Sequence, residues 1–269
     1  MMKRIIFIVL AAACCVWTAS ARGGLVILHT NDTHSHIDPV RGGDQAGLGG
    51  VIERAAYIDS VRAAVGKSNL LLLDAGDFSQ GTSYFTLLNG DLEVELMNAM
   101  GYDVACLGNH EFDNGPAELA RRAKMAKYEI VCANYDFSGS ELADCIKPYT
   151  IVKRGGRKIG IIGLLTDVTD VVDHDIAESM KYIDPAAVTN GYAALLKSRG
   201  CDMVIVLSHL GYNEDVALAK SVMNVDLVIG GHSHTFLSEP TIVNDVTGAP
   251  LPVVTDGCWG LYVGNITIE

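Results

Sequence analysis

The stretch GNHEFD (residues 108–113) places an amide, an imidazole and two carboxylates directly after the short apolar run VACL (residues 104–107). The apolar run predicts a buried strand, and Gly115-Pro116 just beyond opens a helical pattern. A strand-to-helix corner of this kind can hold a metal ligand beside a proton-transfer group. It can also be a polar turn that caps a helix. Other parts of the chain must decide between these interpretations.

The size and charge of the chain limit what it can do. It has 269 residues, enough for one large α/β domain with a real core. Hydrophobic residues make up 49% and charged residues 19%, which is typical of a globular protein and not of a disordered one. The formal net charge of −12 argues against binding a nucleic acid polymer, whose phosphates need a basic face. It allows a small phosphorylated substrate, because metal ions can supply positive charge locally.

Residues 1–21 have the pattern of an export signal. Lys3-Arg4 is followed by an apolar run over residues 5–16 and by the cleavage pattern ASA (residues 19–21). The apolar run is shorter than a membrane-spanning helix. A lipoprotein signal is the alternative, because AAAC (residues 11–14) loosely resembles a lipobox. In both cases we expect export to the periplasm or the outside of the cell, with a membrane anchor only if Cys14 is lipidated.

The rest of the chain alternates apolar runs of four to eight residues with helical patterns, which indicates βαβ units. Strands are predicted at residues 25–28, 70–73, 104–107, 130–133, 203–207 and 227–229, with a hairpin over 149–164 and a β-only tail over 241–268. Helices are predicted at residues 51–65, 91–100, 116–127, 185–198 and 214–223, with Asp91 as an N-cap. We therefore predict one α/β domain over residues 22–269, with α/β/β/α layers or similar.

The cysteine pattern argues against a structural zinc site. Outside the first 21 residues the five cysteines are scattered, with no C-x-x-C pair. Cys106, Cys132 and Cys201 lie in or beside apolar runs and are expected in the core. No disulfide is predicted.

Five predicted strands end in Asp, Asn or His. The segments that follow them hold six of the eight histidines. Functional sites of open α/β sheets lie outside the carboxyl ends of the strands, so we expect these side chains to converge. The segments are DTHSH (residues 32–36), DAGD (74–77), NH (109–110), SH (208–209) and GGHSH (230–234).

Imidazole, carboxylate and amide oxygen without thiolate suit Zn, Mn, Fe, Co or Ni. The side chains are too many for one ion, because a single metal would leave several buried polar groups unpaired. Two divalent ions that share a bridging carboxylate would use them all. Two ions about 3.5–4 Å apart are a common device for activating water against a phosphoryl group.

Together these motifs resemble the calcineurin-like metallophosphoesterase pattern: Asp32-x-His34, Gly76-Asp77, GNHE (residues 108–111), His209 and GGHSH (230–234). More narrowly, LHTND (28–32), GNHEFD (108–113) and SHLG (208–211) resemble the N-terminal catalytic domain of the 5′-nucleotidase / UDP-sugar hydrolase / 2′,3′-cyclic-nucleotide phosphodiesterase family. The resemblance runs from about residue 25 to the C-terminus. It implies a four-layer α/β/β/α metallophosphoesterase sandwich.

The resemblance also implies two metal sites with Asp77 as the bridge. One metal would be held by Asp32, His34, Asp77 and His234, and the other by Asp77, Asn109, His209 and His232. The resemblance further implies that three residues face the substrate: Asn109, His110 and His209.

His110 would be the catalytic imidazole, oriented or charged by Asp113 three residues later. A protonated imidazole there can hydrogen-bond phosphoryl oxygens or the leaving group as charge develops. The alternative for Asp113 is a helix-capping role next to Asn114 or Gly115. Glu111 is expected to be structural.

Other polar residues have plainer interpretations. The family spacing selects His34 as the ligand and leaves His36 as a neighbouring or solvent residue. Asp74 is expected to support the site or to be a loop carboxylate, and His29 to be a core histidine with its hydrogen bonds satisfied. His174 has no motif around it.

The implied function is hydrolysis of a phosphomonoester by an exported two-metal enzyme, with a nucleoside 5′-monophosphate as substrate. A phosphodiesterase or nucleotide-sugar pyrophosphatase of the same fold is one alternative, and a catalytically idle metal-binding partner module is another. Full-length relatives carry a C-terminal domain that contacts the base and the phosphate. No segment of this sequence matches it. We therefore expect base recognition to be absent or to come from a separate polypeptide.

Overall fold

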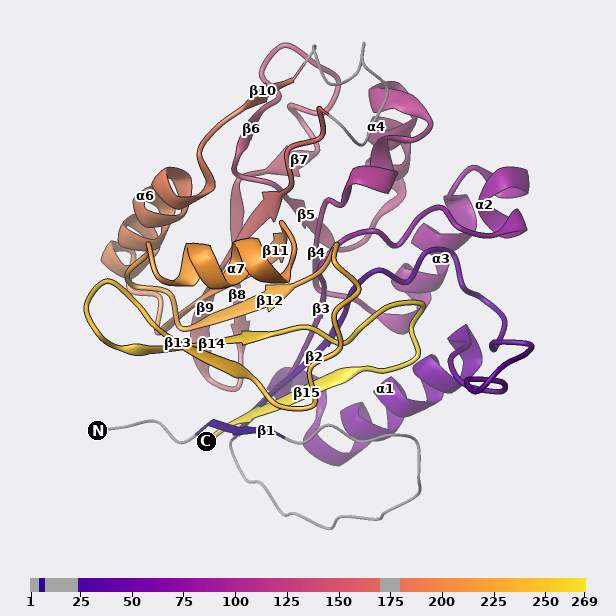
Figure 1. The fold of residues 1–269 in the computed structure, drawn as a ribbon, viewed down its shortest axis with the longest axis horizontal. Coiled ribbons are helices and arrows are strands. Elements are labelled where there is room, and N and C mark those ends of the chain that lie inside the picture. The colour runs from indigo at the N-terminus through magenta and orange to yellow at the C-terminus, as the bar shows by residue number, and fades with distance from the viewer. Residues whose placement is uncertain (1–4, 8–23, 170–179) are drawn as a thin grey trace.

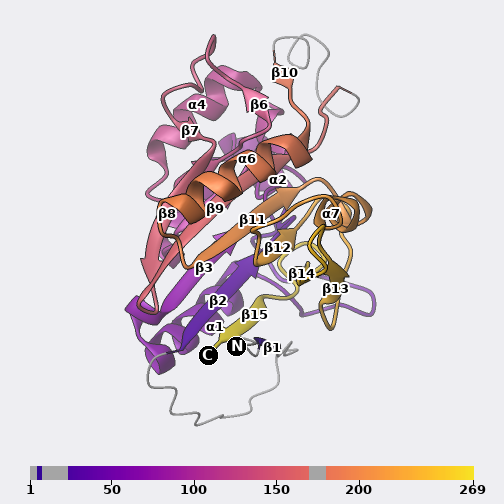
Figure 2. The ribbon, with the colours of Figure 1, turned by 90° about the vertical axis from the view of Figure 1, so that its left-hand side faces the viewer.

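The computed structural model describes residues 5–7, 24–169 and 180–269. Two β-sheets lie face to face, and helices cover the outer face of each sheet. Helices α1 to α4 lie on one side of the sheets and α6 and α7 on the other (Figures 1 and 2). The predicted α/β/β/α sandwich is therefore confirmed.

The first sheet has the strand order β1-β15-β2-β3-β4-β5-β7. Five neighbouring strands of this sheet run parallel, in the order β2, β3, β4, β5 and β7. Strand β15 pairs antiparallel with β2, and β1 pairs antiparallel with β15. The strands are β1 Ile5–Phe7, β2 Leu25–Thr30, β3 Leu70–Asp74, β4 Val104–Cys106, β5 Glu129–Val131, β7 Ile146–Lys147 and β15 Gly264–Ile268. The helices on this side are α1 Val51–Val65, α2 Ser83–Leu88, α3 Asp91–Met100 and α4 Gly115–Met125, with two 3-10 helices, η1 Lys67–Asn69 and η2 Asn109–Phe112.

The second sheet has the order β13-β14-β12-β11-β9-β8. Its strands are β8 Tyr149–Arg154, β9 Arg157–Leu165, β11 Met203–His209, β12 Leu227–Gly230, β13 Thr241–Asn244 and β14 Pro250–Val254. Helices α6 Pro185–Ser198 and α7 Tyr212–Ala219 pack on its outer face. A separate two-stranded sheet pairs β6 Tyr135–Asp136 with β10 Lys181–Tyr182.

Strand alternation explains how one apolar run serves two cores. In β2, Leu25 and Ile27 belong to the core between the two sheets, whereas Val26 and Leu28 belong to the core beneath the helices. Successive side chains of a strand point to opposite faces, so a strand buried on both faces must be continuously apolar. In β3, likewise, Leu71 and Leu73 belong to the core between the sheets, whereas Leu70 and Leu72 belong to the core beneath the helices.

Some predicted boundaries need correction. Gly90, not Asp91, is the N-cap of α3, and Asp91 is the first helical residue. Helix α7 covers residues 212–219 instead of 214–223. The short helix α2 was missed, although Thr82 caps it by accepting a hydrogen bond from the backbone N–H of Tyr84.

The predicted export signal lies largely outside the described residues, including Cys14 and the cleavage site, and so does His174. Within that stretch, Ile5–Phe7 form β1 against β15. In the part of the chain that the structure describes, no helix has the length and apolarity needed to cross a membrane. The five cysteines described are free, and Cys106, Cys132 and Cys201 are buried as expected.

Candidate metal centre

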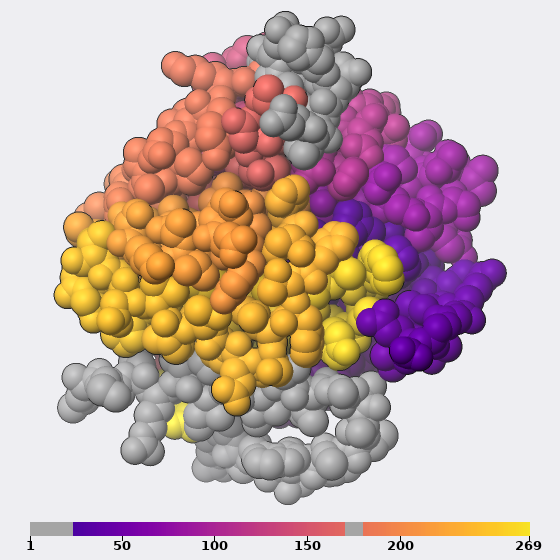
Figure 3. Space-filling model, in the orientation of Figure 1, coloured from indigo at the N-terminus to yellow at the C-terminus, as the bar shows by residue number. Residues whose placement is uncertain are grey.

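The segments that follow β2, β3, β4, β12 and β14 meet at one edge of the sandwich and line a pocket of about 560 Å³. Figure 3 shows N-terminal segments (indigo to purple) meeting C-terminal segments (orange to yellow) on one face of the molecule. The pocket brings together most of the side chains singled out in the sequence. Its lining also includes three residues that the sequence reasoning missed: Gln80, Gly81 and Trp259. The other lining residues are His34, His36, Asp77, Asn109, His110, His232 and His234.

Five of the seven expected metal ligands have a left-handed backbone, with φ between 46° and 72°. Residues other than glycine rarely adopt this conformation, and it is concentrated at functional sites that the surrounding structure holds in place. The loops here therefore aim particular side chains at the pocket and are not relaxed turns. These residues are Asp32, His34, Asp77, His232 and His234.

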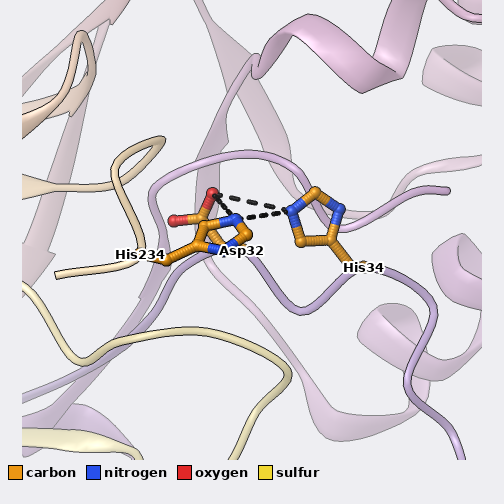
Figure 4. A group of neighbouring side chains, drawn as sticks. All are labelled: Asp32, His34 and His234. Carbon is orange, nitrogen blue, oxygen red and sulfur yellow. Dashed lines mark hydrogen bonds and ion pairs between the residues drawn. The ribbon is translucent and has the colours of Figure 1, made fainter. Parts of the chain in front are cut away.

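The first group of potential metal ligands consists of Asp32, His34 and His234 (Figure 4). The Nε2 atoms of the two histidines lie 2.9 Å apart, and Asp32 Oδ1 lies 3.4 Å from Nε2 of His234 and 3.8 Å from Nε2 of His34. The other oxygen of Asp32 accepts hydrogen bonds from Asn31 Nδ2 at 2.7 Å and from the backbone N–H of His232 at 2.9 Å. Asp32 is therefore held with one oxygen facing two imidazoles.

The second group consists of Asp77, His209 and His232. His209 Nδ1 lies 2.7 Å from the carbonyl oxygen of Ala75, an arrangement in which Nδ1 donates and Nε2 is left as the free nitrogen. Nε2 lies 3.0 Å from Asp77 Oδ2. A backbone carbonyl thus sets the tautomer that a metal ligand requires.

Some buried polar atoms of the expected metal ligands make no hydrogen bond, among them His209 Nε2 of the second group and Oδ1 of Asn109. Buried polar atoms of native proteins nearly always have a partner, and an unpaired one calls for a specific explanation such as an ion. Imidazole nitrogen, amide oxygen and carboxylate are common donors to divalent transition metals. The residues present therefore fit a metal centre.

A third group, His34, Asp77 and His110, connects the first two, because it shares His34 with the first and Asp77 with the second. His110 Nδ1 lies 3.0 Å from Asp113 Oδ2, and this hydrogen bond raises the pKa of His110 above its ordinary value. Asp113 does not cap α4, whose N-cap is Asn114. The hydrogen bond described for the Asp113 side chain is the one to His110.

The carboxylates of the pocket stabilise the protonated, positively charged form of neighbouring histidines. Hydrogen bonding to Asp32 and to Cys258 raises the pKa of His234 to about 10. Burial lowers the pKa of His209, but the nearby carboxylate of Asp77 outweighs it and the pKa rises to about 10. Metal ions would compete with these protons, because a ligating imidazole must be neutral.

Glu111 has the structural role that the sequence suggested. Its fully buried carboxylate accepts hydrogen bonds from the backbone N–H groups of Gly108 at 2.7 Å, Asp77 at 2.9 Å and Ser79 at 3.0 Å. It therefore joins the loop after β3 to the corner after β4. The backbone N–H of His110 in turn donates to Asp77 Oδ1 at 2.9 Å, which fixes the carboxylate expected to bridge the metals.

The remaining polar residues lie around the groups. His36 Nδ1 contacts the carbonyl oxygen of His34 at 2.9 Å and belongs to no potential ligand group among the described residues. Asp74 accepts hydrogen bonds from Thr30 Oγ1 and from the backbone N–H of Gly76, and burial raises its pKa to about 7. His29 is buried, but its Nδ1 has no hydrogen-bond partner, so the expectation of a satisfied core histidine was only half right.

Comparison with known proteins places this geometry in a family. Residues 25–236 match the family model described as calcineurin-like phosphoesterase. A snake venom 5′-nucleotidase of Gloydius brevicauda is 37% identical over 91% of this chain and 45% of its own length. A 5′-nucleotidase of Homo sapiens is 33% identical over 97% of this chain and 49% of its own length.

Solved structures give the same result for the fold. The crystal structure of a 5′-nucleotidase precursor from Thermus thermophilus superposes with a TM-score of 0.85 at 37% identity, covering 91% of this chain and 51% of that one. The chain thus spans about half the length of the curated relatives it matches. The resemblance seen in the sequence is confirmed, and the chain belongs to the calcineurin-like phosphoesterase family.

Proposed function

We propose that this chain is an exported phosphoric ester hydrolase that uses two divalent metal ions and acts on nucleoside 5′-monophosphates. The observation that carries the proposal is the position of Asp77, which belongs to two of the ligand groups in one pocket. The substrate class is suggested by relatives named 5′-nucleotidase at 31–37% identity. Export is suggested by the charge and apolar pattern of residues 1–21.

The proposed ligand sets remain those that the family resemblance implies. Asp32, His34 and His234 would hold one ion, and His209, His232 and Asn109 the other, with Asp77 shared. Bound divalent ions would activate water for attack on phosphorus and offset charge on the phosphoryl oxygens.

Side chains of this chain would stabilise the negative charge that develops on the phosphoryl oxygens and on the leaving group. Asp113 holds one ring nitrogen of His110, which leaves the other nitrogen free to donate a hydrogen bond to a phosphoryl oxygen or to the leaving group. The raised pKa of His110 favours the protonated ring that this role needs. The Glu111 carboxylate would hold Asp77 and His110 in their relative positions by accepting hydrogen bonds from the backbone N–H groups of Asp77 and Gly108.

The test combines metal analysis with a substrate panel. The purified chain should bind about two divalent ions and release phosphate from 5′-AMP faster than from a phosphodiester or a nucleotide sugar. The Asp77→Asn variant should lose metal and activity together, whereas His110→Ala should keep its metal and lose turnover. Faster cleavage of the diester or the nucleotide sugar would instead support the alternative enzymes of this fold. Metal binding without any turnover would support the idle partner module.

A further inference from the structure

Trp259 is the one large apolar side chain among the described residues that line the pocket. The other lining residues are histidine, Asp77, Asn109, Gln80 and Gly81. The indole stacks on the imidazole of His36 with ring centroids 5.0 Å apart and an angle of 20° between the planes. Trp259 nevertheless stays 37% exposed, so aromatic surface remains available at a pocket that is otherwise polar.

The backbone of Trp259 is fixed to the metal-binding loops. Its φ of 61° is left-handed, an outlier for a bulky residue that persists only where the surroundings impose it. Its backbone N–H donates to the carbonyl oxygen of Asp32 at 2.7 Å. His36, the stacking partner, contacts the carbonyl oxygen of His34 at 2.9 Å. Both members of the stack are therefore tied to the loop after β2.

Packing around the loop that carries Trp259 also holds this residue in place. A Cβ atom at Gly260 would overlap the guanidinium of Arg54, which is buried on α1. A Cβ atom at Gly49 would lie 3.5 Å from the carbonyl oxygens of Trp259 and Gly260, so the glycine-rich loop before α1 also packs here. The Trp259 loop is held from several sides, and its side chain is the part left facing the pocket.

We propose that Trp259, backed by His36, is the surface on which the nucleobase ring of the substrate stacks, so that this chain itself contributes to base recognition. The inference rests on the proposed phosphohydrolase function. A pocket of about 560 Å³ has the size of a small-molecule site. Stacking of a base on an aromatic side chain tolerates different bases, because every base has a π-face. The expected preference is therefore for nucleotides over sugar phosphates, without strong selection among bases.

A fluorescence titration tests the contact without requiring turnover or metal. The chain has two tryptophans, Trp17 and Trp259, so the full chain carrying Trp17→Phe reports on Trp259 alone. Adenosine should change its emission in a saturable way, and ribose should not. Equal responses to adenosine and ribose, or no response to either, would overturn the inference. This readout keeps its meaning even if no phosphate ester is hydrolysed, in which case the proposed function alone would fail.

A kinetic comparison tests the consequence for selectivity. Trp259→Leu should lower kcat/KM for 5′-AMP about ten-fold while leaving ribose 5-phosphate nearly unchanged, and Trp259→Phe should retain most of the preference. Tyr182→Leu is the matched control, because Tyr182 is also 37% exposed but does not line the pocket. An equal loss for both substrates in Trp259→Leu, with no recovery in Trp259→Phe, would show that Trp259 only supports the loop.

Discussion

The Nε2 atoms of His34 and His234 face each other at 2.9 Å although the two residues are 200 positions apart in the chain. His34 comes from the loop after β2 of the first sheet, and His234 from the loop after β12 of the second. The pocket is therefore assembled across the junction of the two sheets. Any change that shifts one sheet against the other should affect metal binding before it affects the hydrophobic cores.

The close approach of Gly108 to Asp77 offers one test of how precisely the residues of the pocket must be positioned. A Cβ atom at residue 108 would overlap the backbone nitrogen and Oδ1 of Asp77. Gly108→Ala should therefore displace the proposed bridging carboxylate, reduce metal content and destabilise the fold by about 1–3 kcal/mol. Metal analysis and urea unfolding measure the two effects.

Gly191→Ala in α6 is the control for that substitution. Apart from its chain neighbours and the backbone of its own helix, no described atom lies within 4 Å of the added Cβ, and Ala is the better helix former. This variant should keep its metal and gain about 0.5–1 kcal/mol of stability. Unchanged metal binding in Gly108→Ala would mean that Asp77 tolerates displacement.

Glu111 should be required for the architecture of the site and not for the chemistry. Glu111→Gln replaces an acceptor oxygen with an NH₂ group that faces backbone N–H donors, so at least one buried donor loses its partner. We expect a loss of about 1–3 kcal/mol in the free energy of unfolding, together with weaker metal binding. Glu118→Gln, at an exposed ion pair with Arg121, should change stability by less than about 0.5 kcal/mol. Equal stability of the two variants would contradict the role given to Glu111.

His110 and Asp113 should behave as one unit in turnover. His110→Ala removes the imidazole and is expected to lower kcat by about 10²–10⁴-fold. Asp113→Ala leaves the ring in place without its hydrogen bond, so the loss should be smaller. Because Asp113 acts through His110, the double variant should be no slower than His110→Ala alone. A multiplicative loss in the double variant would show that Asp113 acts independently.

His29 should make stability depend on pH. Burial lowers the pKa of His29 to about 4 in the folded chain, against about 6.5 when unfolded. Between these values the unfolded state binds the proton and the folded state does not, so stability falls as the pH drops from 7 towards 4. From pH 7 to pH 5 the contribution is about 2 kcal/mol. His29→Asn should remove that part of the slope in urea unfolding measured at the two pH values. An unchanged slope would show that the ring is protonated or solvated within the fold.

Much of the fold could be predicted because its signals are local. The boundaries of α1 and α6 match the predicted residues 51–65 and 185–198, since local residues mark them: Gly66 ends α1, and Asp184 followed by Pro185 begins α6. The strands buried on both faces were recognisable from continuous apolarity. The helix α2 was missed because it has only six residues and no repeating apolar face to mark it.

The sequence by itself determined which residue types end each strand and, through their motifs, the family of the chain. The tertiary structure decided how those residues meet. The left-handed backbone at Asp32 and Asp77, the carbonyl of Ala75 that orients His209, and the entry of Trp259 into the pocket all depend on contacts between segments far apart in the chain. Such contacts leave no periodic signal in the sequence, because they join single residues across two sheets and do not repeat along one element.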